Sequence, residues 1–94
     1  MKSSKLINYS IGRYCQKFRQ EELLMNCFKL GIAIPELERS TRNVQSFETG
    51  NSSNIAYLLL YYKNCTTEEQ RAKFIAGLRE TFIQIIESED INNE

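Results

Sequence analysis

The densest group of side chains suited to ligand recognition lies between positions 40 and 50. Polar residues are interleaved there with apolar ones, and arginine is the only charged member of the polar set. An arginine can donate two hydrogen bonds to guanine, and asparagine or glutamine can pair with the edge of adenine. This mixture is typical of a helix that reads base edges. Its members are Thr41, Arg42, Asn43, Gln45 and Ser46.

A short polar turn follows this segment. Asn51, Ser52 and Ser53 come directly after Gly50. Their side chains and backbone N–H groups are of the kind that contacts phosphate oxygens in protein–DNA complexes. Together with the preceding polar residues, the turn indicates a surface that contacts double-stranded DNA.

The other residues of the same segment predict how it is held. Ser40 is a candidate N-cap, and Val44 and Phe47 lie three apart, so both side chains should face a core. Gly50 suits a left-handed exit from the helix. Glu48 is expected to hold the turn through backbone N–H groups. A capped helix that ends at glycine is also common in helical proteins of other functions, so the spacing alone leaves the function open.

The N-terminal third predicts a helix after a flexible lead-in over residues 1–9. Ser10 is a candidate N-cap for that helix. Apolar residues then recur at spacings of four and three, at Ile11, Cys15 and Phe18. The pattern continues to Gly31, a candidate C-terminal stop. It does not decide whether one helix or two lie between Ser10 and Gly31.

The start of the helix that precedes the polar segment has two interpretations. Residues 20–23 may be its first turn, in which case 33–39 is an insertion. Alternatively, residues 34–37 open it, and the helix is about one turn short. We favour the second interpretation, because Pro35 suits the first turn of a helix and Leu37 would then be its buried residue.

Two further helices are expected to complete the core. In the first, over residues 54–63, the inner face is predicted to carry Ile55, Leu58, Leu59 and Tyr62. The other face then carries Tyr57 and Tyr61. The second helix begins with a capping box over residues 66–69. Its predicted inner stripe is Ile75, Leu78, Phe82, Ile85 and Ile86.

The end of this last helix has two expected roles. Phe82, Ile85 and Ile86 either form the contact surface of a homodimer or complete the core of the monomer, and the pattern favours neither. Residues 88–94 have the acidic, polar composition of a disordered tail.

Composition limits the chemistry that this chain can perform. Its 94 residues, 41% hydrophobic and 26% charged, predict one globular domain. It has no histidine and no paired nucleophile, and no Gly-rich loop for phosphates, so we expect no enzyme and no cofactor. We expect no metal site either, since the cysteines lack the CxxC spacing of zinc ligands and suit core packing in a reducing cytoplasm. They are Cys15, Cys27 and Cys65.

The sequence also predicts the location and the charge distribution. It has neither the apolar run of a membrane span nor that of a secretory signal, so a cytoplasmic protein is expected. The formal net charge is zero. Residues 1–63 hold nine basic and five acidic residues, whereas residues 64–94 hold three basic and seven acidic ones. The resulting +4 and −4 fit a DNA-facing body and an acidic arm that turns away from DNA, although chance asymmetry gives the same numbers.

The sequence resembles the phage-repressor and Cro-type (XRE-like) helix-turn-helix family over roughly residues 10–80. The resemblance lies in the capped helix at 40–50, which ends in an aromatic residue, then Glu48, any residue and Gly50. Residues 11–15, 46–50 and 53–58 are similar to short regulators of phages and mobile elements in Gram-positive bacteria. The start of the last helix, at 68–71, is similar to them too.

This resemblance implies an all-α fold. We expect a five-helix helix-turn-helix domain of the phage-repressor type over residues 10–87, with an extended C-terminal helix. It implies a sequence-specific DNA-binding transcriptional regulator, acting as a repressor in a bacterial host and binding palindromic sites as a homodimer. The alternative is a protein-interaction module on the same fold, namely an antirepressor or a phage-encoded inhibitor of a host protein.

Overall fold

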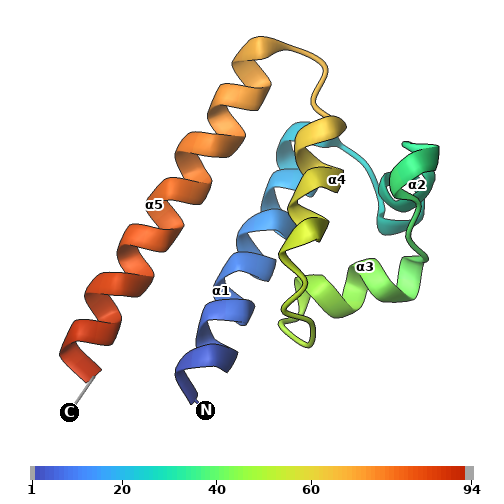
Figure 1. The fold of residues 1–94 in the computed structure, drawn as a ribbon. Helices are drawn as coiled ribbons and strands as arrows, with labels where there is room; N and C mark the ends of the chain where they lie inside the picture. The colour runs from blue at the N-terminus through green and yellow to red at the C-terminus, as the bar shows by residue number, and fades with distance from the viewer. Residues whose placement is uncertain (1, 93–94) are drawn as a thin grey trace.

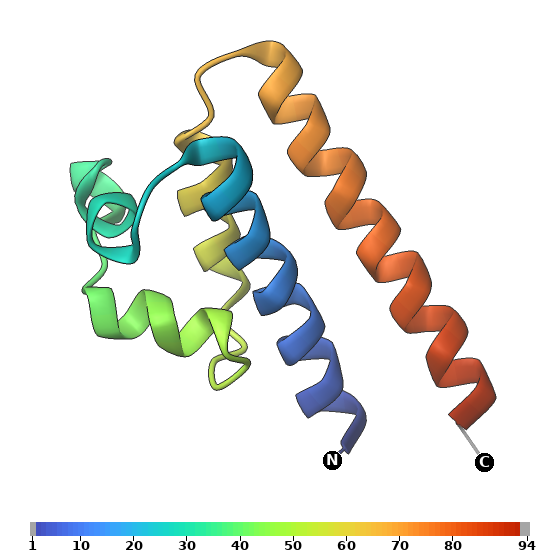
Figure 2. The same cartoon turned by 180° about the vertical axis from the view of Figure 1, so that it is seen from behind.

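The structure, a computed structural model, describes residues 2–92, and within that range it is all-helical, as predicted. Helix α5 runs alongside α1, while α2 and α3 lie on the other side of the molecule (Figure 1). Figure 2 shows the same order from behind. The central helix α1 contacts α3, α4 and α5. The five α-helices are α1 (Lys2–Phe18), α2 (Cys27–Ile32), α3 (Thr41–Glu48), α4 (Leu58–Lys63) and α5 (Glu68–Asn92).

Both ends of the chain are more helical than expected. Helix α1 begins at Lys2, so the prediction of a flexible lead-in over 1–9 is wrong for the described residues, and Ser10 lies inside the helix. Ile7 explains the longer helix, because it packs against the core one turn before Ile11. At the other end α5 continues to Asn92, so the predicted disordered tail is also helical as far as it is described. Residue 1 and residues 93–94 lie outside the described range.

The segment between Phe18 and Cys27 separates two helices. A wide helical turn over Arg19–Leu23 ends at Leu24, whose φ of 54° is left-handed. Asn26 then caps α2, since its side-chain oxygen accepts a hydrogen bond from the Lys29 N–H at 2.8 Å. The open question about residues 11–30 is therefore resolved as two helices.

The favoured interpretation of the next helix is wrong. Residues Pro35–Leu37 form a short 3-10 turn, and the helix that precedes it is α2. Gly31, the expected stop, lies inside α2. The reason is close packing: a Cβ at Gly31 would lie 2.2 Å from the Arg39 carbonyl oxygen. The Arg39 N–H donates to the Gly31 carbonyl at 2.8 Å, so the connection between α2 and α3 folds back onto α2.

The predicted inner face of residues 54–63 is only partly confirmed: Leu58 and Tyr62 pack against the core as predicted, but the residues assigned to the other face are buried too. Tyr57 and Tyr61 are buried, whereas Ile55 and Leu59 are 64% and 44% exposed. The Tyr57 ring stacks on Phe47 with ring centroids 5.1 Å apart. Contact with an aromatic residue of α3 thus decides which face of this segment turns inward. The local sequence pattern cannot predict this contact, because the two residues lie in different elements.

The predicted inner stripe of α5 is confirmed for Leu78, Phe82 and Ile85, which pack in or against the core, and is wrong for Ile75 and Ile86. Phe74 is 1% exposed and Ile85 is buried, but Ile75 and Ile86 are 43% and 59% exposed. Phe74 lies 4.8 Å from the Phe18 ring, centroid to centroid, and it takes the central position that the pattern assigned to Ile75. Because Ile85 belongs to the monomer core, the expected dimer surface cannot include it.

The start of α5 is capped one residue later than predicted. The Thr67 hydroxyl accepts a hydrogen bond from the Gln70 N–H at 3.0 Å. The Gln70 side chain in turn accepts from the Thr66 N–H at 2.8 Å. The reciprocal pattern of a capping box is present, with Gln70 in the place expected for Glu69.

The crossing of α1 over α3 requires glycine at position 12. A Cβ there would lie 2.5 Å from the Phe47 carbonyl oxygen and 2.6 Å from that of Glu48. We predict that Gly12→Ala destabilises the protein, because overpacking costs about 1–3 kcal/mol. The gain in helix propensity is only about 1 kcal/mol.

Urea unfolding followed by circular dichroism would measure this effect. The half-buried Ser10 on the same helix provides the control, since Ser10→Ala should leave the unfolding midpoint nearly unchanged. A stabilised Gly12→Ala variant would show that α1 and α3 lie further apart than described.

Candidate nucleic-acid interface

Helix α3 is anchored as its sequence predicts. Val44 and Phe47 are 0% and 4% exposed and face the core. The Ser40 hydroxyl accepts a hydrogen bond from the Asn43 N–H at 3.1 Å, so Ser40 is the N-cap. Gly50 has a φ of 86°, the left-handed exit expected of it. These contacts fix both ends of the helix and leave its opposite face uncovered.

The predicted recognition residues occupy that uncovered face. Arg42, Asn43 and Gln45 are exposed, and Thr41 and Ser46 are half-buried. Helical spacing brings Arg42, Gln45 and Ser46 together on one side of α3. Thr41 and Asn43 fall at the two edges of that side. The structure therefore gathers all five residues on one helix, with Arg42 in its first turn.

The turn after α3 uses part of its polar groups internally. The Asn51 N–H donates to the Ser46 carbonyl at 2.9 Å, and its side-chain amide donates to the Thr49 hydroxyl at 3.2 Å. The Ser52 hydroxyl accepts from the Asn54 N–H at 3.3 Å. Asn51 and Ser53 are exposed. The Asn51 N–H is therefore already used within the fold and is not free to bind a phosphate.

The expectation for Glu48 is wrong, because its partners are side chains rather than backbone N–H groups. Arg19 donates to both Glu48 oxygens, from Nε and from Nη2, at 2.8 Å each. The Tyr61 hydroxyl donates to Oε2 at 2.8 Å, and the Cys27 thiol donates to Oε1 at 3.7 Å. The side chains of the ion pair are 8% and 2% exposed. Glu48 thus lies at the centre of a buried polar network.

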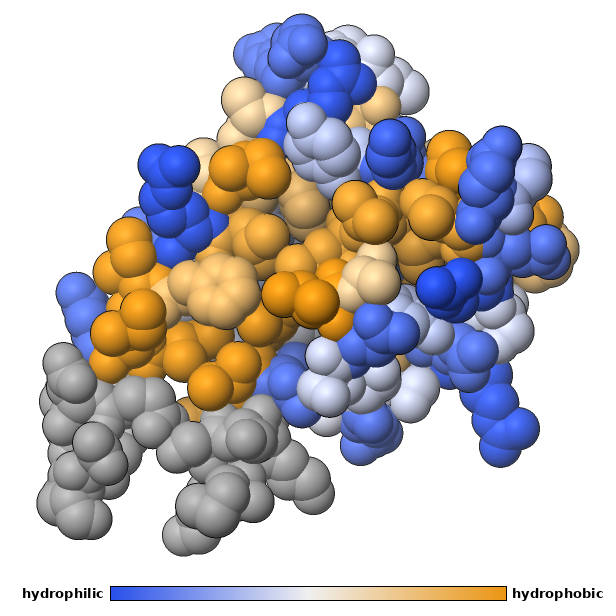
Figure 3. All heavy atoms as spheres, viewed as in Figure 1, coloured by the Kyte–Doolittle hydropathy of each residue, from blue (hydrophilic) through white to orange (hydrophobic). Residues whose placement is uncertain are grey.

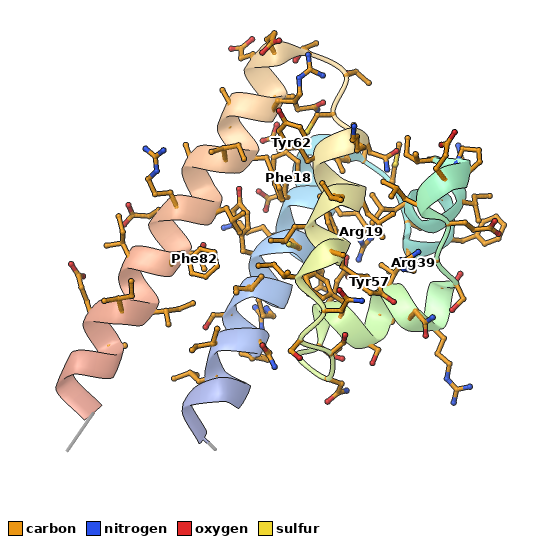
Figure 4. The ribbon with its side chains drawn as sticks, in the orientation of Figure 1. Phe18, Arg19, Arg39, Tyr57, Tyr62 and Phe82 are labelled. Carbon is orange, nitrogen blue, oxygen red and sulfur yellow. The ribbon has the colours of Figure 1, made fainter. Side chains whose placement is uncertain are left out.

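This network joins four parts of the fold around α3. Arg19 follows α1 and also donates to the Met25 carbonyl, at 2.9 Å, just before α2. Tyr61 belongs to α4, and Figure 4 shows Arg19 close to that helix. Burial and the neighbouring Glu48 raise the pKa of Tyr61. The hydrogen bond to Glu48 raises the pKa of Arg19. Both groups therefore keep the protons that they donate to Glu48.

The charges that surround α3 are mixed. Glu36 and Glu38 are exposed on the connection that leads into the helix. Arg39 has a structural role, because its guanidinium lies 5.3 Å from the centroid of the Tyr57 ring and donates to the Glu38 carbonyl at 2.9 Å (Figure 4). Arg42 is the basic residue of α3 itself.

A second basic group adjoins this surface from α1, and the sequence patterns do not reveal it. Tyr9 packs its backbone against Gly50, where a Cβ would lie 2.9 Å from the Tyr9 Cα. Arg13, one turn later, donates to the Tyr9 hydroxyl at 2.6 Å, and its guanidinium lies 5.5 Å from the ring centroid. Arg13, the nearer of the two, is 38 residues from Asn51 in sequence, which hides the pair from any local pattern.

An apolar group lies on the outer side of α2. Phe28 and Ile32 of α2 are 58% and 42% exposed, and Leu24, which precedes α2, is 78% exposed. Large apolar side chains exposed in this way favour contact with another protein.

The three cysteines are free and buried, as expected of core residues. Burial raises the pKa of the Cys15 thiol, which keeps it protonated.

Residues 2–92 contain no group of three histidine, cysteine, aspartate or glutamate side chains placed to hold a metal ion. Within the same range, no helix has both the length and the apolar character needed to cross a membrane.

Searches of family models, curated proteins and solved structures find no match to this chain.

The Glu48 network makes a prediction about stability. Glu48→Ala leaves the Arg19 guanidinium buried without its partner, which costs about 3–5 kcal/mol in comparable pairs. Tyr61→Phe removes one hydrogen bond to a carboxylate, worth about 1.5–3 kcal/mol. Denaturant unfolding should therefore rank wild type above Tyr61→Phe and Tyr61→Phe above Glu48→Ala. The half-buried Tyr62 lies outside the network, so Tyr62→Phe is the control and should change little. Equal losses for the two phenylalanine variants would contradict the role assigned to the Tyr61 hydroxyl.

Proposed function

We propose that this chain is a sequence-specific DNA-binding regulator, with α3 as the helix that enters the major groove. The proposal depends on one observation above all. Helix α3 buries Val44 and Phe47, and the polar side chains suited to base edges are left on its open face. In this proposal α2, the connection 33–40 and α3 act together as a helix-turn-helix unit.

The dimensions of α3 support this assignment. With its side chains an α-helix is about 10–12 Å across, and the major groove of B-DNA, about 12 Å wide, admits it. Residues in the first turn of such a helix reach the bases. Arg42 is placed there to bind guanine, and Gln45, one turn further, to bind adenine.

The surrounding charges suit a binding mode that relies on few phosphate contacts. Arg42 and Arg13 provide positive charge near the groove, whereas Glu36 and Glu38 would repel phosphates. Each phosphate contact adds about −0.9 to the slope of log K against log salt concentration. We therefore expect a shallow slope and an affinity that depends strongly on base contacts. As a regulator in a bacterial cell, a homodimer bound at a palindromic site would act by occluding a promoter.

Selection of binding sites from a random pool of DNA duplexes tests the proposal. The wild-type chain should enrich one sequence, and Arg42→Ala should weaken binding to it by about 5- to 150-fold, the equivalent of about 1–3 kcal/mol. Lys63→Ala removes an exposed positive charge at the end of α4 and is the matched control. It should keep at least half of the affinity for the selected sequence.

Two outcomes would overturn this proposal. One is a pool that yields no enriched sequence at low salt. The other is equal loss of binding in Arg42→Ala and Lys63→Ala, because it would indicate attraction to phosphates without base reading. Circular dichroism of Arg42→Ala should match wild type, since the side chain is exposed.

The exposed apolar group on α2 favours a second candidate function, that of a protein-interaction module such as an antirepressor or an inhibitor of a host protein. In this case the wild-type chain should capture a protein from nuclease-treated host lysate. The double variant Phe28→Ser, Ile32→Ser should no longer capture it. Leu6→Ser is the control, because Leu6 is 45% exposed on a different helix. Capture that is lost after nuclease treatment, or that is equal for both variants, would exclude this function for the α2 group.

A further inference from the structure

A broad apolar surface lies between α4 and α5 (Figure 3). We call it the α4/α5 face. Apolar side chains gather in the centre of the view in Figure 3, over the two helices that Figure 1 shows there. Each of its outer members is at least 42% exposed, and they are Ile55, Leu59, Ile75, Ile83 and Ile86. Large apolar patches of this kind mark interaction sites.

This face is hollowed at both ends. One hollow of about 330 Å³ lies at the start of α5, where Tyr62 faces Ile75 and Ala76. The other, of about 180 Å³, lies further along α5, where Phe82 faces Ile55 and Leu58 of the α4 side. A partner helix laid along this face would therefore find a depression at each end.

Helix α5 itself has the spacing of a helix that pairs with another helix. Exposed residues on its open side recur at intervals of four and three, which is the repeat of a coiled-coil seam. The residues at the start of this seam are small, and those towards its end are large. They are Ala72, Ala76, Arg79, Ile83 and Ile86.

We propose that a second copy of this chain binds the α4/α5 face, with the two α5 helices antiparallel. Antiparallel pairing sets the alanines of one copy opposite the isoleucines of the other, so small residues meet large ones along the seam. Parallel pairing would set alanine against alanine and leave voids, which cost stability.

The charges of α5 favour the same orientation. Residues 68–79 hold three basic and two acidic side chains, a net charge of +1, whereas residues 80–92 hold four acidic and no basic ones, a net charge of −4. With Ala72 opposite Ile86 and Ala76 opposite Ile83, antiparallel pairing sets Glu87 near Arg71 of the other copy and sets Arg79, at the centre of the seam, beside Glu80 of the other copy. Parallel pairing would set the two acidic ends side by side, and like charges repel.

A second α5 alone covers only part of the area that a stable dimer needs. A helix of 25 residues is about 37 Å long and 10–12 Å wide, so a second α5 covers about 400 Å². A stable interface needs about 800 Å² on each partner. The flank of α4 with Ile55 and Leu59 has to supply the rest, which explains why large apolar residues are exposed there as well. We expect a dissociation constant of the order of 10 µM for an interface of this size.

This interface leaves the exposed side of α3 uncovered, but it reaches the turn that follows α3, because Ser52 and Ser53 line the second hollow. Helices α2 and α3 lie to one side of α5 (Figure 1). If the two-fold axis of the dimer is perpendicular to α5 and points towards α2 and α3, both copies of α3 lie on the same side of the dimer. The inference rests on the proposed function in one respect, because a palindromic site requires two copies of the protein. The association itself needs no DNA.

Sedimentation equilibrium of the full chain without DNA tests the inference. Wild type should show a monomer–dimer equilibrium, and Ile86→Glu should weaken it about tenfold or more, because it places a charge within the interface. Leu24→Glu carries the same change on the most exposed apolar residue, on the α2 side, and should dimerise like wild type. Since Ile86 is 59% exposed, the variant should keep its helical circular dichroism; Ile83→Glu provides a second variant of the same kind.

Charge reversal tests the orientation. In the antiparallel dimer, Arg79→Glu and Glu80→Arg should each weaken association, because Arg79 and Glu80 of the two copies meet at the centre of the seam, and the double variant should recover most of it. A monomeric wild type at about ten times the expected dissociation constant would overturn the inference, as would a dimer that Ile86→Glu and Ile83→Glu leave intact. Single reversals without effect would overturn the antiparallel arrangement. Loss of DNA binding with an unchanged dimer would count against the proposed function alone.

Discussion

The rest of this fold depends on the buried ion pair between Arg19 and Glu48. Two hydrogen bonds of 2.8 Å join them, and Tyr61 adds a third to the carboxylate. Removing two charges from water costs several kcal/mol per ion, so a buried pair is stable only when most of its hydrogen-bonding capacity is used. Here Met25 and Cys27 contribute the remaining contacts. The pair links the end of α1 to the last residue of α3, and through Tyr61 to α4, so the position of α3 depends on partners from three other segments.

Close backbone contact complements this network. Gly12 lets α1 approach the carbonyl groups at the end of α3, and Gly31 lets the connection fold back on α2. With Val44 and Phe47 buried, α3 is held from its inner side along its whole length. The exposed side chains of α3 therefore project from a rigid support, which is what base recognition requires and what a flexible loop would not provide.

The surface has three chemically different parts. The outer side of α3 is polar, with Arg42 in its first turn. The α4/α5 face and the outer side of α2 are apolar. A near-neutral chain with mixed charges near α3 gains little from general attraction to DNA. Two copies on one palindrome would compensate, because the second binding event is then intramolecular. The α4/α5 face and α3 thus suit complementary roles in one regulator.

Local features of the fold could be predicted from the sequence, and long-range ones could not. Ser40, Val44, Phe47 and Gly50 act within one helix, so their spacing was enough to predict the anchoring and exit of α3 and the exposure of its polar residues. The partner of Glu48 lies 29 residues away, and no local period relates the two. The inward faces of α4 and α5 were also decided at long range, because both helices are apolar on more than one side. Aromatic packing of Phe74 and Tyr61 turned those faces inward and left Ile86 and Leu59 outside. The sequence by itself determined the helical class and the cap, anchoring and exit of α3, since these depend on neighbours in the chain. Only the tertiary structure decided where α1 and α2 begin and end and which apolar faces are buried, because these depend on contacts between distant segments.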